Sequence, residues 1–212
     1  MQRGTATGFT LVEVLVALMV MAIMAAMAWQ GVDGIVRART ASQARLEQTL
    51  RMNTVIAQWE QDLDAVQETT VLPSALSFDG ATLRLTRRVP GGLQLVVWSL
   101  VPEAGGNVWL RWAGPAVTTG AALQEYWQRS QQFQGNEAGQ LRTLSGIEQW
   151  QMYYFYGNAW SNAQSTGNLA APAPGASAPP RQALPSGVRL VLSFAPGSGH
   201  SGSLVRDTLL GL

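Results

Sequence analysis

The sequence predicts an α+β fold, in which one long N-terminal helix, transmembrane in its first half, packs on antiparallel β-sheets. Three observations predict it. Every residue from Leu11 to Trp29 is apolar except Glu13. Apolar residues then recur at helical spacing as far as Val66, and no proline interrupts them. After Thr69 the hydrophobic period changes to alternation, which is typical of β-strands.

Composition limits the class of protein. The chain has 212 residues, which is room for one modest domain and an anchor. Charged residues make up 13% and hydrophobic residues 47%, which favours a membrane-attached protein. The formal net charge of +1 provides no global field for nucleic acid. The absence of cysteine excludes disulfide frameworks, thiolate zinc sites and cysteine nucleophiles.

The apolar segment over residues 9–30 is long enough to cross a membrane, because about 20 helical residues span the ~30 Å hydrocarbon core. Residues 1–8 before it are short and polar, with one positive charge at Arg3. A secretory signal would have its cleavage site after the apolar stretch, and no such site follows Trp29. We therefore expect a leader peptide at residues 1–8, with cleavage after Gly8, and a membrane helix at residues 9–30.

Residues 31–67 are predicted to continue the helix as an amphipathic segment, with a soft point between Gly31 and Gly34. The inward stripe, which is apolar except at Ser42 and Asn53, consists of Ile35, Ala38, Ser42, Leu46, Leu50, Asn53, Ile56, Trp59, Leu63 and Val66. Glu60, Asp62 and Asp64 suggest a cation site, but residues two apart on a helix do not face each other. We therefore interpret these carboxylates as a solvated charged face.

The remainder, residues 68–212, is predicted to be an antiparallel β domain. Strands are expected at residues 76–78, 82–89, 93–101, 107–113, 141–151, 152–156, 187–195 and 203–210. Residues 121–133 are either a short helix or an irregular loop. Residues 161–186 are rich in Ala, Pro, Gly and Ser, and this composition predicts a flexible loop.

Three sequence patterns resemble functional sites, but each lacks the neighbouring residues or elements that such a site needs. Residues 197–202 match G-x-G-x-x-G, but a nucleotide site needs a helix at the last glycine and an acidic residue about 20 positions on, whereas the ten residues after Gly202 resemble a strand. His200 is the only histidine, and we expect it to be exposed in this loop. The aromatic block at residues 150–160 lacks the basic groove of a single-strand binder, which favours a buried core. We assign no catalytic residue, no metal site and no cofactor.

Glu13 is the residue that needs an explanation, because an acidic side chain within a membrane helix costs roughly 2.5–3.5 kcal/mol. Its context, Gly8-Phe9-Thr10-Leu11-Val12-Glu13, resembles the type IV prepilin signature. The resemblance implies that a prepilin peptidase cleaves after Gly8 and methylates the new terminus at Phe9. It also implies that Glu13 pairs with the N-terminal amine of a neighbouring subunit. A cation at the same depth would make the buried carboxylate tolerable.

More of the chain resembles one subfamily, the minor pseudopilin J of type II secretion. The similar segments lie at residues 58–63, 141–160 and 184–190. The resemblance implies a pilin-like fold and a structural, non-enzymatic subunit at the tip of a pseudopilus. The implied partners are the I- and K-type minor pseudopilins, the H-type pseudopilin, the major pseudopilin and the prepilin peptidase. The implied location is the inner membrane, crossed once, with the C-terminal domain in the periplasm.

Orientation and function each leave an alternative open. Arg37, Arg39 and Arg45 follow the span, and the positive-inside rule would place the C-terminal part in the cytoplasm, against the resemblance. A minor pilin of a type IV pilus or a DNA-uptake pseudopilus would share the N-terminal signature. A periplasmic binding or enzymatic domain on an ordinary anchor would share only the span.

Overall fold

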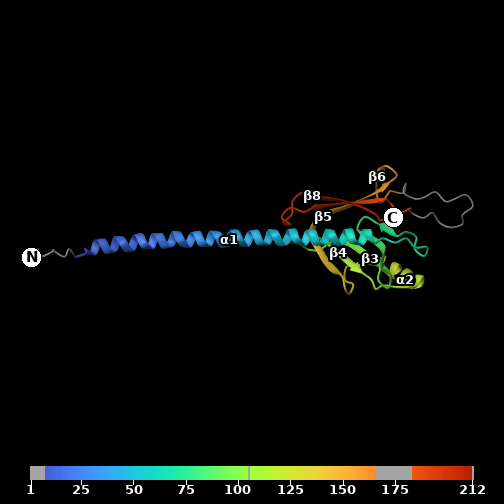
Figure 1. The fold of residues 1–212 in the computed structure, drawn as a ribbon, viewed down its shortest axis with the longest axis horizontal. Coiled ribbons are helices and arrows are strands. Elements are labelled where there is room, and N and C mark those ends of the chain that lie inside the picture. Colours follow the sequence, from blue (N-terminus) through green and yellow to red (C-terminus); the bar gives the residue numbers. More distant parts are fainter. Residues whose placement is uncertain (1–7, 105, 166–182, 212) are drawn as a thin grey trace, which may run out of the picture. The chain divides into compact units, whose positions relative to one another are not determined.

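The computed structural model describes residues 8–104, 106–165 and 183–211 (Figure 1). Residues 1–7 of the expected leader and most of the expected loop at residues 161–186 therefore lie outside the described residues. The chain divides into two compact units, one ending at Thr49 and one beginning at Leu50. Each unit is described by itself.

One continuous helix, α1 (Leu11–Asp64), contributes to both units. It continues without a break through Gly31 and Gly34, where a soft point was expected. In the first unit its side chains are exposed except that of Asp33, which is half-buried. The chain leaves the helix after Asp64, and Val66 then forms an isolated β-bridge with Arg87.

The second unit is built on one antiparallel sheet, which confirms the predicted α+β class. Its strands run in the order β1-β2-β3-β4-β5-β7-β8, and β6 pairs with β5. The strands are β1 (Leu76–Phe78), β2 (Thr82–Val89), β3 (Gly92–Val101), β4 (Asn107–Ala113), β5 (Leu141–Tyr156), β6 (Ala159–Asn162), β7 (Gly187–Phe194) and β8 (Ser203–Leu209). The segment expected as a helix or a loop forms α2 (Gly120–Ser130), capped by the Thr119 hydroxyl, which accepts from the Ala122 N–H.

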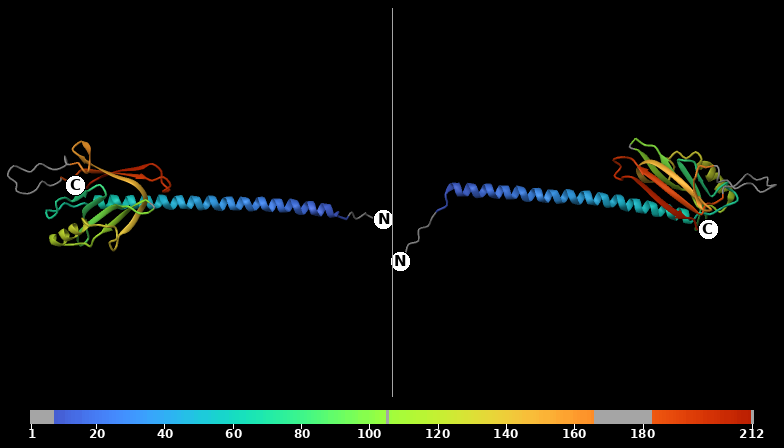
Figure 2. Two further views of the ribbon diagram at one scale, coloured as in Figure 1. Left: turned by 180° about the vertical axis from the view of Figure 1, so that it is seen from behind. Right: turned by 90° about the horizontal axis from the view of Figure 1, so that it is seen from above.

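The expectation of two strands between Leu141 and Tyr156 was wrong, because β5 is a single strand of 16 residues. Its first part pairs with β4 up to Ile147, and its second part pairs with β7 from Ile147 onward. Gly146, at a φ of 71°, and a register shift after Ile147 bend the strand at this change of partner. Figure 2 shows β5 passing between the two halves of the sheet.

The last turns of α1 fill the core between these halves. Trp59 has no exposed surface and lies against three other buried tryptophans, with ring centroids 5.2 Å from Trp109, 5.4 Å from Trp98 and 6.2 Å from Trp150. Such aromatic pairs add about 0.5–1.5 kcal/mol each to the stabilisation from burial. Trp150 and Tyr154 are buried in this core, which confirms the interpretation for this part of the aromatic block, whereas Tyr153, Phe155 and Trp160 are half-buried. A smaller cluster packs α2 on β3.

Candidate functional site

The residues expected to be processed lie just before α1. Gly8, Phe9 and Thr10 are not helical, and all three are exposed. The Phe9 side chain is 88% exposed, and a Cβ built on Gly8 would meet no atom within 4 Å. The peptide bond between Gly8 and Phe9 is therefore accessible to a peptidase, as the expected cleavage requires.

Glu13 and Thr10 form a reciprocal cap at the start of α1. The Glu13 Oε2 accepts hydrogen bonds from the Thr10 N–H and the Thr10 hydroxyl, each at 2.9 Å. The Glu13 N–H donates to the Thr10 Oγ1 at 3.3 Å. This is a capping box, in which the N-cap residue and the residue three positions later satisfy each other's groups. Glu13 thus has a polar partner inside its own chain.

The sequence reasoning missed Thr10, which acts from the N-cap position. The available signal was the pattern Thr-x-x-Glu directly before an apolar run. The partners in the capping box are neutral, so they satisfy hydrogen bonds of the Glu13 carboxylate without neutralising its charge. The cap therefore leaves a cationic partner for Glu13 still to be found, as the sequence argument requires.

The apolar part of α1 presents its side chains outward on every side. Large apolar residues from Leu11 to Trp29 are exposed. In the described part of the chain, α1 is the one helix that is long and apolar enough to cross a membrane. A helix that is apolar all round and unburied by its own domain suits lipid or a bundle of like helices. This exposure agrees with a single-pass anchor.

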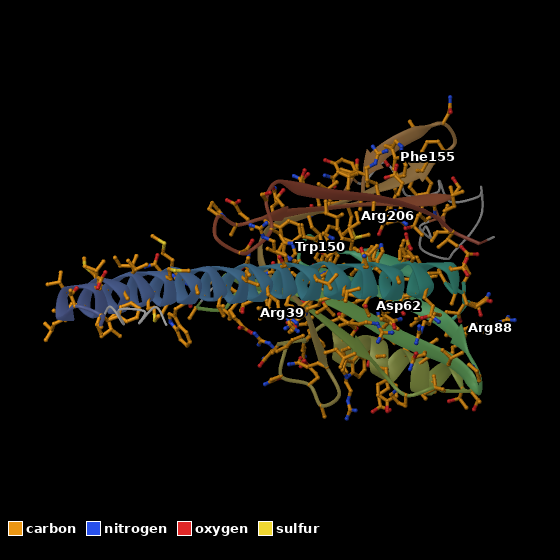
Figure 3. The ribbon with its side chains drawn as sticks, turned by 60° about the vertical axis from the view of Figure 1, so that its left-hand side comes forward. Arg39, Asp62, Arg88, Trp150, Phe155 and Arg206 are labelled. Carbon is orange, nitrogen blue, oxygen red and sulfur yellow. The ribbon has the colours of Figure 1, made fainter. Side chains whose placement is uncertain are left out.

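Asp62 contradicts the expectation of a solvated acidic face. Its side chain has no exposed surface. The Arg111 guanidinium donates to it from Nε at 2.8 Å and from Nη2 at 2.9 Å, and Arg87 donates from Nη1 at 2.6 Å. The Trp98 Nε1 and the Gln58 Nε2 also donate to the carboxylate, at 2.9 and 3.0 Å. Figure 3 shows Asp62 on the last turns of α1, beside the strands.

This polar cluster holds the end of the helix to β2, β3 and β4. Burial lowers the pKa of Arg87, the attraction of Asp62 opposes that shift, and the repulsion of Arg111 adds to it. Two guanidinium groups face one carboxylate, so the cluster repels cations. Across residues 8–104, 106–165 and 183–211, no group of three His, Cys, Asp or Glu side chains could hold a metal ion. The contacts of Asp62 therefore tie the last turn of α1 to three strands of the sheet.

The other two patterns have structural positions. The G-x-G-x-x-G residues form the loop between antiparallel β7 and β8, which is not the strand-to-helix turn of a nucleotide site. His200 in this loop is half-buried, whereas we expected it to be exposed. Its ring lies 4.8 Å from that of Phe194, centroid to centroid, and this contact accounts for the burial.

Comparison with known proteins identifies the N-terminal segment alone. Residues 4–29 match the family described as the prokaryotic N-terminal methylation motif. No curated protein matches the chain. The matched residues contain the Gly8–Phe9 bond, the capping box and the apolar start of α1, so one segment carries the accessible bond, the carboxylate and the anchor. The chain therefore carries a prepilin-type methylation motif at the start of a membrane-length helix.

Proposed function

We propose that this protein is a pilin-like structural subunit, which is cleaved after Gly8, methylated at Phe9 and assembled through α1. The observation that carries the proposal is the methylation motif at residues 4–29, followed by an outward-facing apolar helix and a β domain. After cleavage, the Phe9 amine of one subunit pairs with the Glu13 carboxylate of the next. This pairing sets the axial register of a helical, head-to-tail assembly.

The specific role proposed is that of a minor pseudopilin of type II secretion, the J-type subunit at the pseudopilus tip. In this role the protein spans the inner membrane once and holds its β domain in the periplasm. It acts there with I-, K- and H-type partners to initiate growth of the major pseudopilin. The support is the resemblance of residues 58–63, 141–160 and 184–190. A minor pilin of a type IV pilus or DNA-uptake pseudopilus is the second candidate, because the matched motif is common to both. Neighbouring genes for a secretin and other pseudopilins would favour the first role.

The surface left for partners on α1 is smaller than expected. The amphipathic stripe from Ile35 to Val66 would be the natural contact surface between subunits, but Ile56, Trp59 and Leu63 are buried in the protein's own core. Ile35, Leu46 and Leu50 remain exposed. We therefore place the helical contacts with other subunits on residues 35–50.

N-terminal mass spectrometry of the membrane form tests the proposal. We expect a mature chain that begins at methylated Phe9, and an intact Met1 would refute the pilin-like role. A Gly8→Ala variant tests the junction separately, and we expect it to slow cleavage while α1 and the β domain stay folded. An unprocessed protein that still joins a filament would also contradict the proposal, because its amine would lie eight residues too early.

A further inference from the structure

Strand β8 forms one end of the sheet, and its outer edge is long and regular. All seven of its residues pair with β7 in an unbroken register. Within residues 8–104, 106–165 and 183–211, no strand pairs with its other side. The strand at the opposite end, β1, has only three residues. Short edge strands resist the addition of another strand and long flat ones favour it. The edge at β8 is therefore suited to strand addition, and the edge at β1 is not.

The register of β8 against β7 shows which backbone groups face outward. The Leu210 N–H donates to the Ser186 carbonyl at 3.1 Å. Alternate residues of an antiparallel strand face the same partner, so the even-numbered residues of β8 face β7. The outward N–H and C=O groups therefore belong to the odd-numbered residues Ser203, Val205, Asp207 and Leu209. These groups form a ladder that an added strand can complete.

The two charged side chains of β8, which could otherwise oppose strand addition, form ion pairs within the domain. Arg206 forms an ion pair with Glu60 of α1. Arg189 of β7 donates to both Asp207 oxygens, at 2.7 Å each, and this bonding lowers the pKa of Asp207 although burial opposes it. Natural edge strands are protected by free charges, proline or bulges. Strand β8 contains no proline or bulge, and both its charges are paired.

Exposed apolar side chains continue to the edge. Val205 is 53% exposed and Leu209 is 80% exposed. One row of residues crosses four neighbouring strands on the outer face of the sheet. It runs from Leu209 on β8 through Gly187 on β7 and Phe155 on β5 to Trp160 on β6. A hollow of about 230 Å³ lies over Gly187, where the row lacks a side chain. An apolar strip thus begins beside the open backbone ladder.

We propose that β8 docks an extended strand of a different protein chain, which adds to this edge of the sheet. The open ladder selects an extended backbone, because only a strand satisfies alternate N–H and C=O groups. Val205 and Leu209 favour apolar side chains opposite them. The Arg206 side chain pairs with Glu60 but stays half exposed, so it tolerates an added strand and can share its charge with an acidic residue opposite it on the inner face. The partner strand therefore carries two apolar residues four positions apart, with an acidic residue next to one of them.

A second copy of this chain fits the edge less well. Antiparallel pairing of two β8 strands over their full length places residue 206 opposite itself, because it is the middle residue of Ser203–Leu209. Two arginines would then face each other directly, and like charges at opposite positions are destabilising. The register that pairs all seven residues therefore disfavours a second copy, and we assign the docked strand to a different chain. This inference concerns the β domain and does not depend on the proposed N-terminal processing.

Site-specific photocrosslinking in the native membrane tests the edge. The full chain carries a benzoylphenylalanine in place of Val205, or in place of Leu141 as the control, which is 56% exposed on β5. We expect position 205 to crosslink to an extended segment of a different chain, and position 141 to give no such adduct. An adduct to another copy of this chain, equal adducts at both positions, or no protein adduct at 205 would overturn the proposal.

Edge-blocking variants make the test specific to the backbone ladder, with the crosslinker moved to Asp207. Val205→Pro removes an outward N–H and no bond to β7, so we expect the melting temperature to change little and the adduct to be lost. Val205→Lys places a free positive charge at the edge without altering the backbone, and we expect the adduct to be lost in this variant too. Val205→Thr keeps the N–H and the strand propensity and should retain the adduct. Unchanged adducts in the Pro and Lys variants would refute strand addition. The N-terminus is measured in the same membranes, so a failure of processing is distinguished from a failure of docking.

Discussion

Glu13 serves two chemically separable purposes in this account. Inside the chain it accepts hydrogen bonds from Thr10 and closes the first turn of α1. Between chains it is proposed to neutralise the Phe9 amine. The first purpose needs an oxygen acceptor, and the second needs a negative charge. A glutamine satisfies the first requirement and fails the second, so substitution can separate the two.

We expect Glu13→Gln and Glu13→Ala to be cleaved and methylated like the wild type but to be lost from the assembly. The physical reason is that neither side chain offers a charge to the Phe9 amine. Glu13→Gln should also keep the first turn protected in amide exchange, because Gln can serve in a capping box. The measurements are N-terminal mass spectrometry and the amount of protein in sheared filaments. Normal incorporation of the Gln variant would remove the pairing argument.

We expect Asp62→Asn to destabilise the β domain by about 3–5 kcal/mol, because it leaves buried arginines without their counter-charge. The exposed Asp64 is two residues away and provides the matched control, with an expected change within about 0.5 kcal/mol for Asp64→Asn. Urea unfolding of the full chain in detergent, followed by tryptophan fluorescence, measures both. Equal effects of the two substitutions would mean that the cluster around Asp62 contributes little.

At the scale of elements, β5 joins the two halves of the sheet at Gly146. A Cβ at this glycine would lie 2.3 Å from the Ser198 Cβ, and φ is 71°. Gly139 has a similar φ of 82° but meets no atom within 4 Å. Left-handed backbone costs a side-chain-bearing residue about 1–2 kcal/mol at either position. We expect Gly146→Ala to destabilise clearly more than Gly139→Ala, measured by thermal unfolding. Equal losses would show that the backbone angle alone accounts for the glycine.

The turn between β1 and β2 gives a prediction for acid stability. Burial raises the pKa of Asp79. The hydrogen bonds from Arg84, at 2.7 Å, and from the N–H groups of Ala81 and Thr82 lower the pKa by more than burial raises it, so the net shift is downward. Because the pKa is lower in the folded state, ionised Asp79 stabilises the fold at pH values above its pKa in the unfolded chain, about 4. This contribution to the free energy of unfolding is lost as the pH falls from there through the lower pKa of the folded state. Because Asp79 is half-exposed, we expect less than about 1 kcal/mol.

Unfolding midpoints measured at about pH 5 and about pH 3 check this prediction. The wild type should lose more stability between these two values than Asp79→Asn, because the variant lacks the titrating carboxyl. Asp64→Asn, which alters an exposed carboxylate, should behave like the wild type. A decline in Asp79→Asn as steep as that of the wild type would assign the acid sensitivity to other carboxylates.

At the scale of the whole molecule, the division at Thr49 and Leu50 predicts where the chain can be cut. We expect a fragment of residues 45–212 to fold, because it retains the turns of α1 that fill the core. A fragment of residues 68–212 lacks Trp59 and Leu63, which are fully buried, and should lose its near-ultraviolet circular dichroism. Native-like signals from the shorter fragment would show that the sheet holds its core without the helix.

The sequence predicted the elements better than their contacts. Helical and alternating periods are local, so α1 and most strands could be read within a few residues of their bounds. The burial of Asp62 could not, because its partners Arg87 and Arg111 lie 25 and 49 positions away in the sequence. The continuity of β5 was missed because a local pattern does not show that one strand pairs with β4 over its first part and with β7 over its second. At the candidate site, the roles of Gly8, Phe9 and Glu13 stay predictions, and the capping role of Thr10 was missed.

The capping box has a thermodynamic consequence for assembly. Both Thr10 and Glu13 lie after the Gly8–Phe9 bond, so cleavage leaves their hydrogen bonds in place. The conformational entropy of the first turn, about 1–2 kcal/mol for each backbone residue fixed, is therefore lost when α1 forms. It is not lost again when subunits join. In the proposed assembly, the mature terminus would meet its neighbour as a preorganised ligand, and more of the free energy of pairing would remain to hold the filament together.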